Sequence, residues 1–166
     1  MNRLKKEFFT RDVLHVAPEL LGKVLTCSTN DEIFRYRITE TEAYRGSEDL
    51  ACHASKGRTA RTEAMYREGG ILYVYLIYGM YWMLNVVSGS ENEPQAALIR
   101  GIEGLYGPGR ITRKLQIDKS FYGEDISTSS RIWIEDEALK PSYNCAPRIG
   151  IDYAGEWKDK LWRYFY

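Results

Sequence analysis

The apolar pattern of the chain centres on residues 71–87, which read ILYVYLIYGMYWMLNVV. This stretch carries no charge, but a bilayer crossing needs about 20 predominantly apolar residues, and tyrosine prefers membrane interfaces. β-Branched and aromatic residues favour strands instead. We therefore predict a mostly buried hairpin, with strands over residues 71–77 and 81–87 and a tight turn through Tyr78, Gly79 and Met80.

The turn of this predicted hairpin has an unusual composition. Gly79 can supply the positive φ that tight turns often need. Tyr78 and Met80, however, are large apolar residues at positions where hairpin turns are normally small and polar. Either the tip packs beneath another loop of the protein, or it is a wedge that enters something stacked, such as a base step of DNA.

The rest of the chain predicts short elements in one domain, residues 1–166, without repeats or linkers. Thr10 or Asp12 can cap a helix that ends at Gly22, with Pro18 opening a second turn. A helix over 110–116 follows a Gly-Pro-Gly turn, and the aromatic tail is expected to be docked. The predicted strands are 23–28, 33–43, 96–102, 132–135 and 147–152, with a turn at Asn30–Asp31 between the first two.

Composition argues against several classes of protein and site. Lys and Arg total 23 and Asp and Glu total 23, so the net charge does not point to a polyanionic partner. Cys27, Cys52 and Cys145 fit neither a disulfide framework nor a CxxC metal site. With two histidines we expect no structural metal. The N-terminus lacks a signal-peptide pattern, which favours an intracellular, reducing compartment and no membrane attachment.

Candidate acid–base chemistry lies near the end of the second predicted strand. Glu40 and Glu42 are two residues apart and share one face of that strand, with Tyr44 following them. The two carboxylates can be an acid–base pair or a solvated strand face. Tyr36 and Ile38 on the same face favour partial burial, which raises a carboxyl pKa and suits a general base near neutral pH.

Positive charge gathers at three places. Arg100 is the only charge in its predicted strand, so it requires a carboxylate or phosphate partner, or forms a structural salt bridge. Arg110 begins the predicted helix, whose exposed amides can bind an anion. The long loop carries four basic residues against Glu63, and these can hold a phosphate backbone or simply solvate the loop; they are Lys56, Arg58, Arg61 and Arg67.

Seven motifs, taken in order, resemble a known family. They are ITETEAYRG (38–46), ACHA (51–54), GRTAR (57–61), LYVYLIYGMYWMLNVV (72–87), ALIR (97–100), GPGR (107–110) and RIGIDYAGEW (148–157). Their order and spacing, over about residues 10–166, resemble the alkyladenine, or 3-methyladenine, DNA glycosylases of the alkylpurine class. The resemblance implies an α+β fold: a single domain with a curved antiparallel sheet, flanking helices and a protruding β-hairpin that inserts into DNA.

The resemblance also implies an activity. Such enzymes bind double-stranded DNA in the minor groove as monomers, without a cofactor, and flip out damaged purines such as 3-methyladenine, hypoxanthine or ethenoadenine. By motif, Glu42 activates the water that hydrolyses the N-glycosidic bond, Arg100 positions Glu42 and the water, and the carbonyl of Ile149 completes the water site. No lysine lies in the Glu42 motif, so we expect an abasic site without strand cleavage. Glu40 is expected to be structural.

Other roles carry over in the same way. Tyr44, His53 and Tyr75 sandwich the flipped base, and Asn85 disfavours normal guanine. Tyr78 fills the gap in the base stack, with Met80 beside it. Arg58, Arg61 and Arg110 contact the DNA backbone. The location implied is the bacterial cytoplasm with its nucleoid, or another intracellular site.

The chain departs from the family pattern in the loop beside the expected pocket. Ala60 and Thr62 stand where the family usually has proline and asparagine, and residues 67–69 often contain prolines in the family. The resemblance therefore predicts the affinity for DNA and the range of lesions less closely than it predicts the chemistry. The competing hypotheses are a non-catalytic binder of distorted DNA and a protein-interaction module. Glu42 and Arg100 favour the enzyme, because a pure binder has no need of a carboxylate facing DNA.

Overall fold

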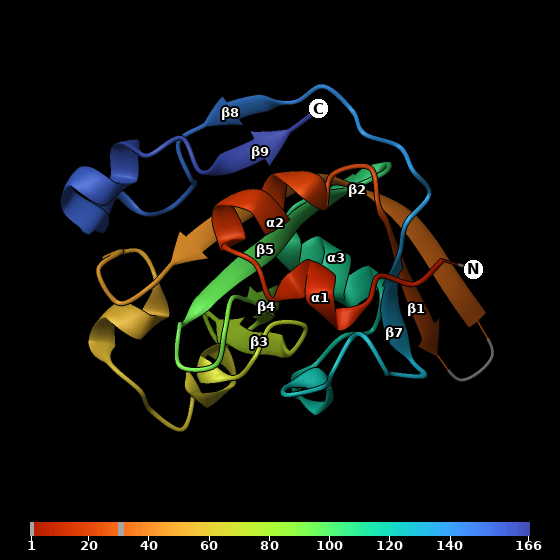
Figure 1. Ribbon diagram of the computed structural model, residues 1–166, viewed down its shortest axis with the longest axis horizontal. Helices are drawn as coiled ribbons and strands as arrows, with labels where there is room; N and C mark the ends of the chain where they lie inside the picture. The colour runs from red at the N-terminus through yellow and green to blue at the C-terminus, as the bar shows by residue number, and fades with distance from the viewer. Residues whose placement is uncertain (1, 30–31) are drawn as a thin grey trace.

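The computed structural model describes residues 2–29 and 32–166, and these form an α+β fold built on one curved, nine-stranded antiparallel sheet (Figure 1). The helices are α1 (Lys6–Phe9), α2 (Val13–Glu19) and α3 (Pro108–Lys114), with 3₁₀ turns η1 (His53–Lys56), η2 (Glu63–Tyr66), η3 (Lys119–Phe121) and η4 (Asp152–Asp159). The strands are β1 (Val24–Thr29), β2 (Glu32–Arg45), β3 (Leu72–Ile77), β4 (Tyr81–Ser88), β5 (Gln95–Ile102), β6 (Leu105–Tyr106), β7 (Ile132–Glu135), β8 (Asn144–Ala146) and β9 (Arg163–Phe165). The fold class expected from the resemblance is confirmed.

β2 is the strand on which the sheet is organised. The order is β3-β4-β5-β2-β1-β7, with β6 on β5 and with β9 pairing both β2 and β8. The first half of β2 pairs with β1, and its second half pairs with β5 and β9. The register with β5 shifts between Ile38 and Thr41, as in a β-bulge. A bulge bends a strand and increases its twist, which lets β2 serve both halves of the sheet.

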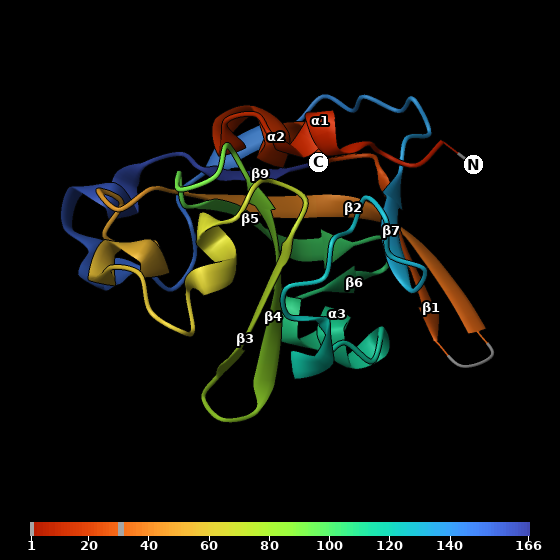
Figure 2. The same cartoon turned by 60° about the horizontal axis from the view of Figure 1, so that its bottom comes forward.

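Helices lie on both faces of the sheet. α1 and α2 cover one face and α3 lies on the other, beside β4 (Figure 2). α2 begins where Asp12 accepts a hydrogen bond from the backbone N–H of Leu14 at 2.9 Å, as predicted for a cap. Gly22 follows with a φ of 81°. Pro18, however, lies in the last turn of this one helix, so the prediction that it opens a second turn is wrong.

The two hairpin strands of the central apolar stretch are confirmed, and their turn has Tyr78 at φ 53° and Gly79 at φ 66°. The base of the hairpin is buried, but burial decreases from Tyr75 towards the turn, so the expectation of a mostly buried hairpin holds only for its base. Tyr78 is 83% exposed and Met80 60% exposed. The tip therefore does not pack beneath another described loop, and Figure 2 shows it at the far end of the hairpin.

The C-terminal region contains the main difference from the predicted elements. Residues 147–152 are not a strand, because Pro147 lacks an N–H donor and Gly150 has a φ of 77°. The strand in this region is β8, which pairs with β9. The docked tail is confirmed, since β9 also pairs with β2. The remaining predicted strands and the helix agree with β1, β2, β5, β7 and α3 within a few residues.

The predicted turn at Asn30–Asp31 lies outside the described residues. None of the helices in the described part of the chain has both the length and the apolar character that a membrane crossing requires.

Three backbone segments cross closely at the base of the hairpin. The backbone N–H of Gly69 donates to the carbonyl of Gly89, and the N–H of Gly89 donates to the carbonyl of Phe9, both at 3.0 Å. A Cβ placed on Gly69 would lie 2.1 Å from the carbonyl oxygen of Phe9. Only glycine therefore lets α1 and the base of the hairpin approach this closely.

We predict that Gly69→Ala lowers the free energy of unfolding by about 1–3 kcal/mol, because the added methyl group displaces backbone rather than a flexible side chain. Urea denaturation measures the change. Ser90→Ala, at an exposed position in the neighbouring loop, is the control and changes it by less than about 0.5 kcal/mol. Equal stability of the Gly69 variant and wild type would show that the crossing is not constrained.

Candidate active site

Glu42 lies in the second half of β2 with no exposed surface. Its Oε1 accepts a hydrogen bond from the backbone N–H of Ile149 at 2.7 Å, and its Oε2 accepts one from the Tyr44 hydroxyl at 2.8 Å. Arg100 Nη1 lies 3.6 Å from Oε2. Burial raises the pKa of Glu42, and the positive charge of Arg100 opposes that rise. The predicted covering of this strand face is confirmed.

Arg100, on the neighbouring strand β5, lies between two carboxylates. Its Nε is 3.6 Å from Glu40 Oε1, and its Nη1 is at the same distance from Glu42. Glu40 also accepts a hydrogen bond from Arg163 at 3.0 Å. Two guanidinium groups therefore hold Glu40, which supports its expected structural role, and Arg100 has the carboxylate partners that its isolated position in the strand requires.

The segment that brings Ile149 to Glu42 is anchored by an ion pair that the sequence analysis did not identify. Arg148 donates to both carboxylate oxygens of Asp49, at 2.6 and 2.9 Å, and to the carbonyl of Ala43 at 2.9 Å. The side chains of Arg148 and Asp49 have no exposed surface. Breaking such a pair costs about 3–5 kcal/mol, since one buried charge remains unpaired. The pair fixes the loop whose next residue binds Glu42.

A small aromatic pocket, with a cavity volume of about 20 Å³, lies beside this carboxylate. Tyr44 lines the pocket and also donates to Glu42, so the two features meet at this residue. Four residues predicted to contact the flipped base line this pocket: Tyr44 from β2, His53 from η1, Tyr75 from β3 and Asn85 from β4. Ile149, which was also predicted to belong to the site, is not among the lining residues. The lining includes Tyr44, His53, Met65, Tyr73, Tyr75 and Asn85.

Tyr73 belongs to this pocket and was missed in the sequence. Its hydroxyl is 2.8 Å from His53 Nδ1, and its carbonyl accepts a hydrogen bond from Asn85 at 3.1 Å. The ring of Tyr75 lies 4.6 Å from that of His53 and 5.2 Å from that of Tyr73, centroid to centroid. Tyr73 and Tyr75 alternate on one strand and therefore share a face. That spacing was the signal available in the sequence.

The pocket rings are neutral near pH 7. Burial, aided by the nearby charges of Arg61 and Lys56, lowers the pKa of His53 to about 4. Burial raises the pKa of Tyr75 to about 12 and that of Tyr44 well above its ordinary value. Neutral aromatic surfaces of this kind can stack on a planar ligand whatever its hydrogen-bonding pattern.

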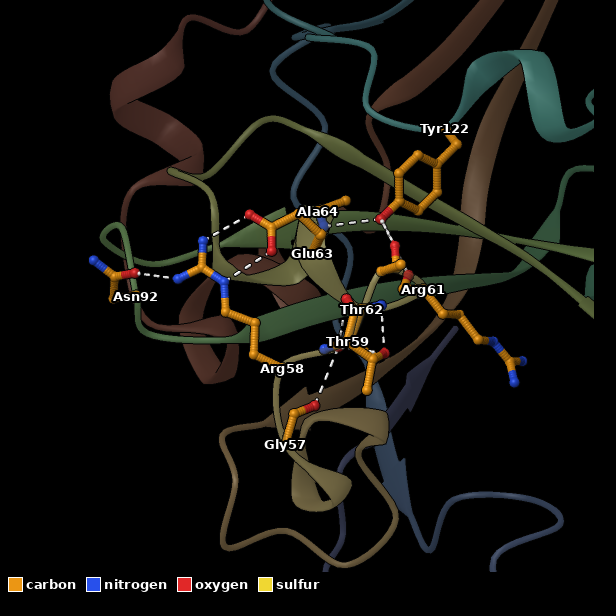
Figure 3. A network of polar contacts seen from close by, with 10 residues as sticks. Gly57, Arg58, Thr59, Arg61, Thr62, Glu63, Ala64, Asn92 and Tyr122 are labelled. Carbon is orange, nitrogen blue, oxygen red and sulfur yellow. Dashed lines mark hydrogen bonds and ion pairs between the residues drawn. The ribbon is translucent and has the colours of Figure 1, made fainter.

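The three arginines predicted to contact DNA differ in their surroundings. Arg58 donates to Glu63 at 2.6 and 2.8 Å and to Asn92 at 2.9 Å (Figure 3). Its guanidinium therefore already has protein partners and closes the 57–64 loop. Arg61 is exposed and lies over the ring of Tyr75. Arg110 is exposed in the first turn of α3.

Thr59 and Thr62 shape the loop where the chain departs from the family pattern. Thr62 is buried, and its Oγ1 accepts a hydrogen bond from the backbone N–H of Thr59 at 2.9 Å (Figure 3). The same hydroxyl donates to the carbonyl of Gly57 at 3.2 Å. These local bonds hold the turn that contains Ala60 without the rigidity of proline.

Residues 2–29 and 32–166 contain no group of three His, Cys, Asp or Glu side chains placed to hold a metal ion. The polar groups of the site instead bond to one another. The arrangement offers a buried carboxylate of raised pKa, a neighbouring guanidinium and a neutral aromatic pocket, which together can bind a planar group and activate water beside it.

Comparison with known proteins identifies the family of the chain. The family model described as methylpurine-DNA glycosylase (MPG) matches residues 7–107 and 104–166. The chain belongs to the methylpurine-DNA glycosylase family. The match spans both the β2 segment that carries Glu42 and the C-terminal loop that binds it.

Several relatives that carry the name "Putative 3-methyladenine DNA glycosylase" match nearly the whole chain. The protein from Psychrobacter cryohalolentis is 45% identical over 98% of this chain and 91% of its own length. Those from Natranaerobius thermophilus and Desulfitobacterium hafniense are 41% and 43% identical, over 98% and 99% of this chain and 94% and 95% of their own lengths.

The lowered pKa of His53 predicts a pH dependence of stability. Between the ordinary pKa of 6.5 and the folded pKa of about 4, the unfolded state binds a proton on His53 that the folded state does not. The contribution of His53 to the free energy of unfolding is therefore complete above pH 6.5 and decreases as the pH falls towards 4. We expect His53→Gln to lose less stability over this range than wild type in urea denaturation. Parallel curves for the two proteins would contradict the assignment.

Proposed function

We propose that this protein is a base-excision repair glycosylase that removes 3-methyladenine-type purines from double-stranded DNA by hydrolysing the N-glycosidic bond. The observation that carries the proposal is the position of Glu42, buried at the edge of an aromatic pocket through its bond to Tyr44. Membership of the methylpurine-DNA glycosylase family supports the same reaction. The proposed substrates also include hypoxanthine and ethenoadenine.

The chemistry requires one activated water. Glu42 accepts a proton from this water, and the water oxygen bonds to C1′ of the deoxyribose as the C1′–N bond breaks. The bonding electrons leave with the base, and the sugar passes through an oxocarbenium-like state. The raised pKa of Glu42 suits it to accept this proton near neutral pH, and Arg100 holds the carboxylate in place.

One carboxylate is sufficient for an alkylated purine. Such a base is already cationic, so it leaves as a neutral molecule without a second acid. Glu40 is held by Arg100 and Arg163 and is not needed as that acid. No lysine lies in the Glu42 motif, so the product is an abasic site with both strands intact.

Access to the bond requires the nucleotide to leave the duplex. Flipping costs a few kcal/mol, and stacking on aromatic rings returns about 1–3 kcal/mol per base. Tyr44, His53 and Tyr75 supply these rings in the pocket. The exposed tip residue Tyr78 enters the minor groove and fills the gap in the base stack, with Met80 beside it.

The protein acts on DNA as a monomer inside the cell, and exposed arginines hold the backbone. Arg61 and Arg110 have guanidinium groups at the surface, free to approach phosphates. Arg58 contributes by holding the loop that carries Arg61, because its own guanidinium is bonded to Glu63 and Asn92. Asn85, buried in the pocket wall, disfavours the exocyclic amine of normal guanine.

The first experiment measures release of free base from two duplexes in the presence of a metal chelator. One duplex is alkylated with a methylating agent, and the other contains hypoxanthine. We expect wild type to release base and Glu42→Gln to release none, since glutamine cannot accept the proton from water. Alkali treatment reveals the abasic sites, and gel-shift binding to the same duplexes is retained by the variant. Loss of binding together with activity would argue against Glu42 as the base. Binding without release by wild type would favour a non-catalytic binder of distorted DNA.

Tyr78→Ala tests the tip residue. We expect it to weaken binding to a lesion-containing duplex by roughly tenfold, a loss comparable to one stacking interaction, while excision from a lesion in single-stranded DNA changes little. Ile33→Ala, at an exposed apolar position away from the hairpin, serves as the control. Unchanged duplex binding in the Tyr78 variant would exclude the wedge.

A further inference from the structure

Tyr75 lines two hollows of the molecule. One is the aromatic pocket, which it lines with Tyr44 and His53. The other is a second hollow, to which Arg61 and Lys119 also belong. The guanidinium carbon of Arg61 lies 5.3 Å from the centroid of the Tyr75 ring, and Arg61 is not among the residues that line the aromatic pocket. The ring thus has over it a cation that is not part of the pocket lining.

The charge of Arg61 is not balanced by a neighbouring carboxylate. Tyr44 also lies under a guanidinium, that of Arg148 at 4.8 Å, but Arg148 is buried and paired with Asp49. Arg61 is exposed, and no carboxylate in the described part of the chain forms a salt bridge with it. Figure 3 shows its side chain extending away from the bonded network of the loop. The two walls of the pocket therefore differ in electrostatics.

The 57–64 loop keeps Arg61 in this position. The bonds between Thr59 and Thr62 form the turn around it, and the Tyr122 hydroxyl donates to the carbonyl of Arg61 at 3.1 Å. Arg58 closes the loop through Glu63. The backbone of the loop that carries Arg61 is thus held by hydrogen bonds within the protein.

We propose that Arg61 tunes lesion preference through the Tyr75 ring, disfavouring cationic alkylated purines relative to neutral ones such as hypoxanthine. This rests on the proposed function. The face of an aromatic ring is electron-rich and attracts a cation. When the guanidinium of Arg61 lies over this ring, a cationic base that stacks on the same ring gains less from stacking and is repelled by the guanidinium. A neutral purine incurs no such repulsion.

The sign of the effect is the same in binding and in bond cleavage. During cleavage of an alkylated nucleotide, positive charge moves from the base to the sugar. With a neutral purine, the base gains negative charge as the sugar gains positive charge. The base–sugar fragment therefore carries one more positive charge for the alkylated purine throughout. The Arg61 cation disfavours the alkylated purine at both stages.

The test compares wild type with Arg61→Gln on duplexes of one sequence that contain either 7-methylguanine or hypoxanthine. Single-turnover excision at subsaturating enzyme gives a rate for each. We expect the variant to raise the ratio of the 7-methylguanine rate to the hypoxanthine rate by about two- to fivefold, the size of an exposed cation–π interaction. Arg61→Lys keeps the charge and stays closer to the wild-type ratio. Ethenoadenine against hypoxanthine, both neutral, gives an unchanged ratio.

Arg110→Gln is the matched control. Its guanidinium is exposed in the first turn of α3, outside the loop that carries Arg61. Any loss of DNA affinity in this variant affects all lesions alike, so the ratio stays at the wild-type value. Thermal melting checks the fold of each variant, and the exposed Arg61 makes no side-chain hydrogen bond among the described residues that its replacement would break.

Two outcomes overturn the proposal. An equal fall in both rates for Arg61→Gln shows that Arg61 contacts only the DNA backbone, and a lower ratio shows the opposite electrostatic effect. Competition binding of the two duplexes to Glu42→Gln, with and without Arg61→Gln, gives the ratio of their affinities in the absence of base release. Absence of base release by wild type would refute the proposed function, while this binding ratio would still decide the role of Arg61.

Discussion

Burial of the Glu42 carboxylate is the constraint on which the rest of the site depends. A charge removed from water costs several kcal/mol unless it is paired and hydrogen-bonded. Three groups compensate Glu42: the Tyr44 hydroxyl, the backbone N–H of Ile149 and the guanidinium of Arg100. They come from β2 itself, from the loop after β8 and from β5. The carboxylate can therefore remain buried only when the sheet and the C-terminal segment are both in place.

The same constraint accounts for the deeply buried ion pair of Arg148 and Asp49. Arg148 bonds to the carbonyl of Ala43, next to Glu42, while its backbone leads directly to Ile149. Burying these two charges is costly, but it connects the loop after β2 with the loop after β8. The 3₁₀ turn η4 adds apolar contacts to this junction (Figure 1). Stability and the geometry of the candidate catalytic group thus depend on the same contacts.

The base of the hairpin is packed in the core, and its tip is exposed. Its base belongs to the core and is locked against α1 by the close crossing at Gly69, while Tyr78 and Met80 stand exposed at the tip. Tyr75 lies between these regions and lines both the aromatic pocket and the hollow that contains Arg61. The hairpin therefore carries core residues at its base, a pocket residue on β3 and two exposed apolar residues at its tip.

The features that arise from local patterns could be predicted from the amino-acid order alone. Strand periodicity placed Glu40 and Glu42 on one face, and the composition of residues 71–87 gave both hairpin strands and their turn. The amino-acid order alone did not determine the pairing of Asp49 with Arg148 or the approach of Ile149 to Glu42. These depend on segments about 100 residues apart meeting in the folded chain. Periodicity reports which way neighbouring side chains point, whereas the partner of a buried charge is decided only when the whole sheet has packed.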